Sequence, residues 1–512
     1  ISIWHDEDFI SKDASGPFMR DNVDGSPDTG RRPGIWSRAY LPITVANLTV
    51  VATVGFGGLA LVAGLSTIAE DLGNVRLLPW VFTGYYAASA IAVVVAGPVI
   101  DAVGVRRTFR VTGIWLLLFT GAAAAAPSML MLVLVRTLQG FGVGLVFAVS
   151  TATIGLGYPH YLRPRAFAAQ SVVFGVMGLG GPALAGAMLA AGGWRVIFVA
   201  QLPVTMIALV SGWVTLPTIR DRPARIQTDW RGTWLLTLVV GCSLAAVSQV
   251  GVSWWAAGAA TVLTAVVMRA YWRHSGLVDA PVLAREHLTR FPLQWVHVTS
   301  GMAIFIVVGS DNFLPLYVQT ARGQSVEFAA FTLVFAAVGW TMGSLIYSRL
   351  LVGWRESEVI RLGCWLLIPS LGLAGTTVAL IDWPLPVLFG ALTVIGVSVG
   401  LVTTAGLTLL QANGQQAEMG RLSAAHEFVR QLAIMYGVAL AGAILLLVID
   451  VRVGDVDAVR DVIAGEDIAL GSETNDAIRY GVVWAYVAVG MFAMGCLLAG
   501  TSLVRRTRRL AP

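Results

Sequence analysis

The stretch Gly97-Pro-Val-Ile-Asp101-Ala-Val-Gly104-Val-Arg106-Arg107 joins two apolar runs, each about as long as a helix that crosses a bilayer. It places one carboxylate at the end of the first run, a glycine in the turn and two arginines after the turn. Such a carboxylate can accept hydrogen bonds at the N-terminus of a neighbouring helix, or it can pair with arginines. We therefore expect Gly97, Asp101, Gly104, Arg106 and Arg107 to form a gating latch between two helical bundles. The alternative is an ordinary basic turn.

The composition indicates that most of the chain lies in lipid. Of 512 residues, 56% are hydrophobic and only 12% are charged, and the mean hydropathy is +0.76. These values are incompatible with a soluble surface. Apolar runs of about 20 residues recur from Leu41 to Val504. The sequence predicts an all-α integral membrane protein with fourteen spans, at residues 41–67, 80–100, 109–126, 129–153, 166–190, 194–216, 232–250, 253–271, 293–318, 326–350, 358–380, 384–411, 420–450 and 479–504.

Arginine indicates the orientation of these spans, because Lys12 is the only lysine. An even number of spans puts both termini on one side of the membrane. The loops on that side hold roughly threefold more arginines than the loops on the other side, so the N and C termini are predicted to be cytoplasmic. The preference for arginine, with much Ala, Gly and Val, is typical of a GC-rich bacterial genome. We expect a multi-pass protein of the bacterial inner membrane.

The predicted spans divide the chain into parts. Residues 1–40 are expected to be a disordered cytoplasmic tail, because they mix acidic residues with Gly, Ser and Pro and show no apolar periodicity. Met19 is a candidate native start, in which case residues 1–18 are foreign to the natural chain. Two six-helix bundles are predicted at 41–216 and 293–504, separated by a linker with two extra helices at 217–292. An acidic outer loop at about 451–478 and a basic cytoplasmic tail at 505–512 complete the chain.

Two further motifs lie inside predicted spans. Arg136-Thr-Leu-Gln139-Gly140 places an arginine within the fourth span, where a charge is costly unless it faces a partner or a water-filled cavity. Gly178-Leu-Gly180-Gly181-Pro182-Ala-Leu-Ala-Gly186 gathers small residues around a proline in the fifth span. This composition predicts close approach of another helix and a kink, and simple helix packing explains it equally well.

The three motifs, in this order and at these helices, resemble the signature motifs of the major facilitator superfamily, and the fifth-span motif resembles the one that its antiporters carry. Four other segments resemble the superfamily's fourteen-helix drug/proton antiporter branch. They are Trp194-Arg195-Val-Ile-Phe198, Asp229-Trp-Arg-Gly232, Leu314-Pro-Leu-Tyr317-Val-Gln319 and Phe428-Val-Arg430-Gln431. The resemblance covers residues 41–504. It implies two six-helix bundles plus two central helices, and multidrug efflux by alternating access, driven by a proton gradient without a cofactor.

The sequence departs from this branch at a residue that is a candidate for binding the transported proton. Its members usually carry an aspartate midway along the first helix, and this chain has Gly57 at that position. Intramembrane carboxylates are functional candidates, and only Asp311 and Glu427 lie well inside predicted spans. If the two halves are pseudo-symmetric, Asp311 lies within about one helical turn of the depth of the missing aspartate. The alternative for Asp311 is a structural or wet carboxylate, and for Glu427 it is a static ion pair with Arg430.

The substrate would occupy a cavity between the bundles, and it is expected to be a small apolar or amphipathic molecule. Aromatic residues that can line such a cavity are Phe56, Tyr85, Tyr86, Phe141, Phe174 and Trp340, although each is also suited to packing. An exporter or flippase of lipids or cell-envelope precursors is the alternative function, and a non-transporting subunit or sensor is a third. An enzyme is disfavoured, because six histidines form no metal-spaced cluster and no nucleophile elbow occurs. We expect protons and membrane lipids as partners, no nucleic acid, no metal, and a monomer.

Overall fold

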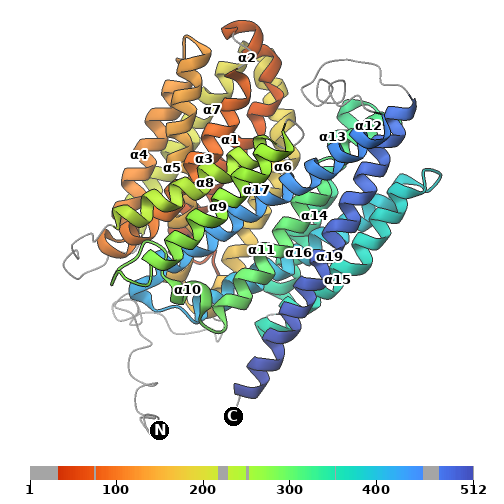
Figure 1. Ribbon diagram of the computed structural model, residues 1–512. Helices are drawn as coiled ribbons and strands as arrows, with labels where there is room; N and C mark the ends of the chain where they lie inside the picture. Colours follow the sequence, from red (N-terminus) through yellow and green to blue (C-terminus); the bar gives the residue numbers. More distant parts are fainter. Residues whose placement is uncertain are drawn as a thin grey trace.

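The computed structural model describes residues 33–73, 77–216, 229–249, 253–351, 353–453 and 472–510. Within these ranges the regular structure is entirely helical. Figure 1 shows two groups of helices standing side by side, with α17 running between them. The end of the molecule that carries Asp101, which the arginine distribution predicts to be cytoplasmic, is called the inner end below, and the opposite end is called the outer end.

The N-terminal bundle covers the first six predicted spans. Its helices are α1 Leu41–Ala63, α2 Leu65–Leu72, α3 Leu78–Val103, α4 Val105–Ala124, α5 Met129–Gly157, α6 Arg163–Gly192 and α7 Trp194–Thr215. Two of the turns depend on a glycine with positive φ: Gly104 (φ 87°) between α3 and α4, and Gly193 (φ 76°) between α6 and α7. At the outer end, Asp71 accepts hydrogen bonds from Arg195 and from Trp194 Nε1, and the Arg195 bond lowers the pKa of Asp71.

The C-terminal bundle covers the last six predicted spans, and two of these spans are interrupted. Its helices are α11 Leu293–Asp311, α12 Leu314–Thr320, α13 Val326–Phe331, α14 Leu333–Arg349, α15 Glu356–Ala379, α16 Leu385–Ala412, α17 Met419–Arg452 and α19 Ser472–Leu510. Pro315 explains the break between α11 and α12, because it lacks an N–H and its ring crowds the carbonyl four residues earlier, that of Asp311.

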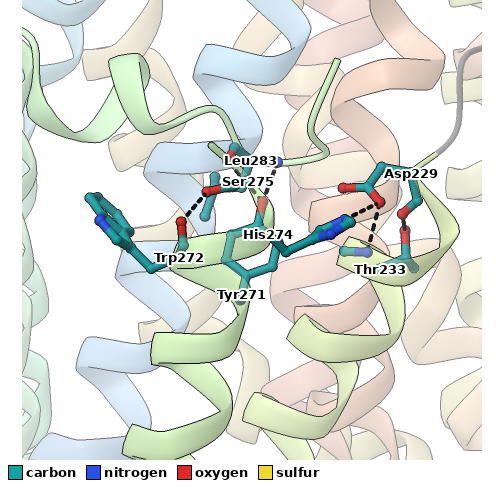
Figure 2. A network of polar contacts seen from close by, with 8 residues as sticks. Asp229, Thr233, Tyr271, Trp272, His274, Ser275 and Leu283 are labelled. Atoms are coloured by element: carbon teal, nitrogen blue, oxygen red, sulfur yellow. Dashed lines mark hydrogen bonds and ion pairs between the residues drawn. The ribbon is translucent and has the colours of Figure 1, made fainter. Parts of the chain in front are cut away.

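The segment between the bundles forms a helical hairpin, α8 Trp230–Ser248 and α9 Trp254–His274, followed by the short helix α10 Arg285–Thr289. Figure 2 shows the polar contacts at its inner end. Asp229 caps α8 by accepting from the Gly232 N–H (2.8 Å), and the same carboxylate oxygen lies 2.7 Å from His274 Nε2 on α9. The Tyr271 hydroxyl donates to the Leu283 carbonyl (2.8 Å) and accepts from the Leu283 N–H (2.9 Å), which fixes the linker to α9.

The hairpin covers one seam between the two bundles. Val239 of α8 and Leu283 of the linker share one buried apolar cluster with Val93 of α3 and Phe428 of α17. Farther along α8, the Ser243 and Tyr436 hydroxyls are 3.0 Å apart and connect α8 to α17. Because α3 and α17 belong to different bundles, the hairpin contacts both.

Glycines allow matching helix crossings in the two bundles. A Cβ built on Gly140 would lie 2.1 Å from the Tyr85 carbonyl oxygen, and one on Gly144 would lie 2.0 Å from that of Ser89, so α5 meets the backbone of α3 directly. In the C-terminal bundle, a Cβ on Gly343 of α14 would lie 2.1 Å from the Val397 carbonyl oxygen of α16. Small residues at such spacing are the usual means of close packing between helices in lipid.

Helices cover all fourteen predicted spans, and within the described ranges nine helical segments are long and apolar enough to cross a membrane. The count of fourteen spans and the cytoplasmic side of the termini stay predictions. Residues 1–32, 454–471 and 511–512 lie outside the described residues, and with them most of the expected tail, including the candidate start at Met19, and most of the acidic loop.

Two predicted boundaries are wrong. Residues 33–40 pack against the N-terminal bundle instead of continuing a disordered tail: Ile35 is 6% exposed, and its carbonyl accepts from Thr44 Oγ1 at 2.8 Å. Helix α19 begins at Ser472 and ends at Leu510, so it includes part of the expected outer loop and most of the expected basic tail. Arg508 in its last turn forms an ion pair with Glu358 of α15 at 2.9 Å. The negative end of the helix dipole also favours an arginine at this position.

The glycine crossings can be tested with Gly140→Ala. The added methyl group would overlap the Tyr85 carbonyl, so we expect the variant to lose about 1–3 kcal/mol of stability and to unfold at a lower temperature in detergent. Gly241→Ala is the matched control, because a Cβ on Gly241 of α8 meets no atom within 4 Å. Equal unfolding midpoints for the two variants would contradict the direct contact between α3 and α5.

Candidate functional site: the inner interface between the bundles

Asp101 connects the two bundles at the inner end. Its carboxylate oxygens accept from the main-chain N–H groups of Gly420 (2.7 Å) and Arg421 (3.0 Å), which lie in the first turn of α17. These N–H groups have no partner within the helix, and the positive end of the helix dipole favours a carboxylate there. Of the two arrangements that the sequence allows for Asp101, the structure has the helix N-terminus.

The glycines of the latch motif allow this close approach. A Cβ on Gly97 would lie 2.8 Å from Arg421 Cα, and one on Gly420 would lie 2.5 Å from the Asp101 carboxylate. The two arginines of the motif lie elsewhere. Arg106 Nε donates to the Leu216 carbonyl within the N-terminal bundle, and Arg107 is exposed. The latch therefore joins the bundles through Asp101 and the glycines.

Glu427 and Arg430 lie on α17 at the same interface. The Glu427 carboxylate is 2% exposed and accepts two hydrogen bonds from Arg430 Nη1, at 2.8 and 2.9 Å. Thr151 of α5, in the other bundle, donates to the same carboxylate at 3.3 Å. Gln411 of α16 donates from its amide to the Thr151 carbonyl at 2.8 Å. The structure thus brings the predicted ion pair into contact with the opposite bundle.

Asp311 lies at the break between α11 and α12. It is the last residue of α11 and is partly buried, and Ser310 Oγ donates to its carboxylate at 2.9 Å. Among the described residues, no arginine or histidine comes within ion-pair distance of this carboxylate. The Tyr486 hydroxyl of α19 lies within electrostatic reach of it and is buried without a hydrogen-bond partner among the described residues. Asp311 is far along α11 from the inner interface, so the structure does not bring it to Glu427.

Arg136 is buried in the outer part of the N-terminal bundle. Its guanidinium is 0% exposed, donates to Gln139 Oε1 at 2.7 Å and lies 4.0 Å from the centre of the Tyr85 ring. Gln139 in turn donates to Thr120 of α4 at 2.8 Å. Gly140 provides the close crossing with α3 described above. In the fourth-span motif the amide of Gln139 and the ring face of Tyr85 therefore stabilise the buried Arg136 cation. Within the described ranges, no carboxylate lies within ion-pair distance of Arg136.

The fifth-span motif lies on α6 beside α14. A Cβ on Gly178 would meet Ala337 of α14 at 3.9 Å, whereas one on Gly186 would meet nothing within 4 Å. Gly181 is buried, and the side chain of Pro182 lies outside the described part of the structure. The contact between α6 and α14 continues inward, where Thr341 Oγ1 donates to the Ser171 carbonyl at 3.0 Å.

The aromatic cavity candidates lie in different environments. Phe56 (8% exposed) and Tyr85 (3%) are buried among neighbouring helices, whereas Tyr86 is 48% exposed. The Phe141 ring lies 6.0 Å from that of Trp115, and the exposed Phe174 stacks on Phe147 at 6.1 Å. Trp340 packs against the core of the C-terminal bundle. Gln201 of α7 fills the space beside Gly57, because a Cβ built on Gly57 would lie 2.7 Å from the amide oxygen of Gln201.

Sequence reasoning missed Thr151, Gln411 and Arg163, which all join the bundles at the inner end. An amide near the end of an apolar run, as at Gln411, is a sequence signal for such a contact, because a polar group in lipid needs a partner. Thr151 carries no such signal. Arg163 lies in a predicted loop, where an arginine indicates only the orientation of the spans.

Comparison with known proteins decides the family. The family model described as Major Facilitator Superfamily matches residues 45–438. This chain belongs to the major facilitator superfamily. It is therefore a multi-pass membrane transporter by family, and its two-bundle fold agrees with that membership.

Its relatives include bacterial efflux proteins. A probable multidrug-efflux transporter of Mycobacterium tuberculosis (strain ATCC 25618 / H37Rv) is 27% identical over 82% of this chain and 91% of its own length. A multidrug resistance protein B homolog of the same strain is 27% identical over 65% of this chain, and the match covers 63% of that protein, under two thirds of its length. The multidrug efflux pump SdrM of Staphylococcus aureus (strain N315) is 23% identical over 74% of this chain and 83% of its own length.

Solved structures share the fold. The human organic anion transporter MFSD10 superposes with a TM-score of 0.61 at 14% identity, covering 89% of this chain and all of the other. A bacterial homologue of the iron transporter ferroportin, in an outward-facing state, also gives 0.61, at 11% identity over 90% of this chain and 99% of its own. At these identities the likeness concerns the fold alone.

The role of Asp101 can be tested with Asp101→Ala. The variant loses both hydrogen bonds to α17, and bonds to a charged group are worth about 1.5–3 kcal/mol, so we expect the inner end to open more often. A cysteine at Thr151, placed in a chain with its three native cysteines replaced, should then react about tenfold faster or more with a maleimide. Arg107→Ala is the control, because Arg107 is exposed. Unchanged labelling in Asp101→Ala would contradict the latch.

Proposed function

We propose that this protein is a proton-coupled secondary transporter that exports hydrophobic or amphipathic small molecules by alternating access. It would act in the bacterial inner membrane with both termini in the cytoplasm. The observation that carries the proton part of this proposal is Asp311, a carboxylate within a membrane segment that has no cationic partner among the described residues.

Alternating access is supported by where the bundles meet. Among the described residues, polar contacts from one bundle to the other lie towards the inner end, at Asp101, Thr151, Arg163 and Ser171. Each bundle is packed within itself through its own glycine crossings. Two rigid bodies joined by a small set of polar contacts can separate at one end without disturbing either core.

Asp311 is a better proton site than Glu427. Glu427 is buried beside Arg430, so loss of its charge would leave an unpaired guanidinium at the interface. Asp311 has no such partner within the described ranges, and the break at Pro315 leaves irregular backbone next to it. Irregular backbone within a membrane segment is tolerated where it is buried in protein or lines a cavity. Asp311 is the nineteenth residue of α11 and Gly57 the seventeenth of α1, a difference of about 3 Å in depth.

Export of apolar or amphipathic molecules is supported by the relatives, two of which are named as multidrug efflux proteins and a third as a multidrug resistance protein homolog, at about one quarter identity. The Asp311 carboxylate, when ionised, could additionally attract a cationic amphiphile. We therefore take ethidium, an aromatic cation, as the probe.

The proposal can be tested with Asp311→Asn in proteoliposomes. With an imposed pH gradient, the wild-type protein should accumulate ethidium against its concentration gradient, and Asp311→Asn should not, because the amide cannot bind and release a proton. Downhill ethidium exchange should be retained in the variant. Asp382→Asn, which alters an exposed carboxylate between α15 and α16, is the matched control and should accumulate ethidium normally.

The outcomes separate the parts of the proposal. Gradient-driven accumulation that survives in Asp311→Asn would contradict the assignment of the proton to this residue. If the wild-type protein does not move ethidium but moves a fluorescent phospholipid between leaflets, the lipid alternative is favoured and the drug substrate is wrong. Movement of neither probe would count against transport of this class of solute.

A further inference from the structure

The turn between α16 and α17 is held by the N-terminal bundle at both of its ends. Asp101 of α3 binds the first turn of α17, as described above. On the other side, Arg163 at the start of α6 donates from Nη1 to the Gln411 carbonyl at 3.0 Å, and Gln411 lies in the last turn of α16. The turn that joins these helices, residues 413–418, thus lies between a carboxylate and a guanidinium of the opposite bundle.

Arg163 is positioned by its own bundle for this contact. Its Nη2 donates to the Gly155 carbonyl at 2.7 Å and its Nε to the Tyr158 carbonyl at 3.3 Å. Gly155 lies in the last turn of α5, and Tyr158 directly follows that helix. One planar guanidinium therefore serves three carbonyls, two of its own bundle and one of the other, and its five donors in a fixed fork suit this arrangement.

The charges of the two contacts match the helix ends that they meet. The last carbonyls of a helix lack partners within the helix and form the negative end of its dipole, which favours a cation. Arg163 meets two such ends, those of α5 and α16. Asp101 meets the positive end of α17. The C-terminal bundle thus presents the negative end of α16 to Arg163 and the positive end of α17 to Asp101.

The third contact of Arg163 is the one that changes when the bundles separate. The bonds to Gly155 and Tyr158 lie within the N-terminal bundle and would persist. The bond to Gln411 crosses the interface, as does the bond from the Gln411 amide to the Thr151 carbonyl at 2.8 Å. Arg163 is thereby held in place to bind the end of α16 each time that the inner end closes.

We propose that Arg163 is the second closing contact of the inner gate, a positioning residue that binds the C-terminal end of α16 while Asp101 binds the N-terminal end of α17. This inference rests on the proposed function, because a gate has a role only if the bundles alternate. It assigns to Arg163 a part in the transport cycle that the motifs of the sequence do not indicate.

The test uses the full chain with its three native cysteines replaced by alanine. Spin labels are placed at His160 of the N-terminal bundle and Arg355 of the C-terminal bundle, both exposed at the inner end, and their distance distribution is measured by pulsed electron paramagnetic resonance. Arg163→Gln should raise the ratio of long to short distances about tenfold, as expected for loss of a bond to a charged group. Arg165→Gln, which changes an exposed arginine one half-turn away, should leave the ratio unchanged.

A second variant keeps the test decisive if the first variant does not fold. Arg163→Lys keeps the charge but cannot reach three separate carbonyls from one nitrogen, so it should raise the ratio less than Arg163→Gln does. A wild-type ratio in a folded Arg163→Gln, or in Arg163→Lys if Arg163→Gln does not fold, would overturn the inference. Failure of the proposed function would look different: the wild-type protein itself would keep one distance with and without ethidium and a pH gradient.

Discussion

The closed inner end depends on a carboxylate that caps a helix of the opposite bundle. In lipid, apolar helix surfaces gain little from meeting each other, so the attachment between two bundles relies on packing of small residues and on hydrogen bonds. Asp101 supplies two such bonds to the start of α17, and Gly97 and Gly420 allow the helices to come close enough for them to form. With Arg163 on the other side, the α16–α17 turn is bound to the N-terminal bundle through charge and hydrogen bonding.

In the proposed transport cycle this interface acts as a gate, because each bundle is held together by its own close helix crossings. The crossings of α5 with α3 and of α14 with α16 bring backbones together at glycines, so these pairs of helices cannot slide without overlap. Motion is then directed to the seams between the bundles. The α8–α9 hairpin covers one of these seams, since it shares an apolar cluster with both α3 and α17. The other seam, between α6 and α14, is joined near its inner end through Ser171 and Thr341.

Much of the architecture could be predicted from the sequence, because lipid imposes long apolar helices and the arginine motifs mark their ends. The motif at Asp101 also allows the contact with a neighbouring helix N-terminus that the structure has, although Arg106 binds elsewhere and Arg107 is exposed. Other features depend on contacts that no periodicity shows. Arg163 looks like any loop arginine until α16 lies beside it, and the order of residues 33–40 arises from burial of Ile35. The break beside Asp311 follows from Pro315, whereas the nearness of Tyr486 of α19 to that carboxylate depends on tertiary packing.

Coupling of solute to protons is the central claim, and its most direct measurement is the counterflow of protons. Purified protein is reconstituted into vesicles that enclose a pH-sensitive dye, and ethidium is added on one side without an imposed pH gradient. We expect ethidium uptake to drive protons out of the vesicles, so that the internal pH rises in proportion to the ethidium that enters, and we expect a protonophore to abolish the change. Ethidium uptake with no change in internal pH would contradict it.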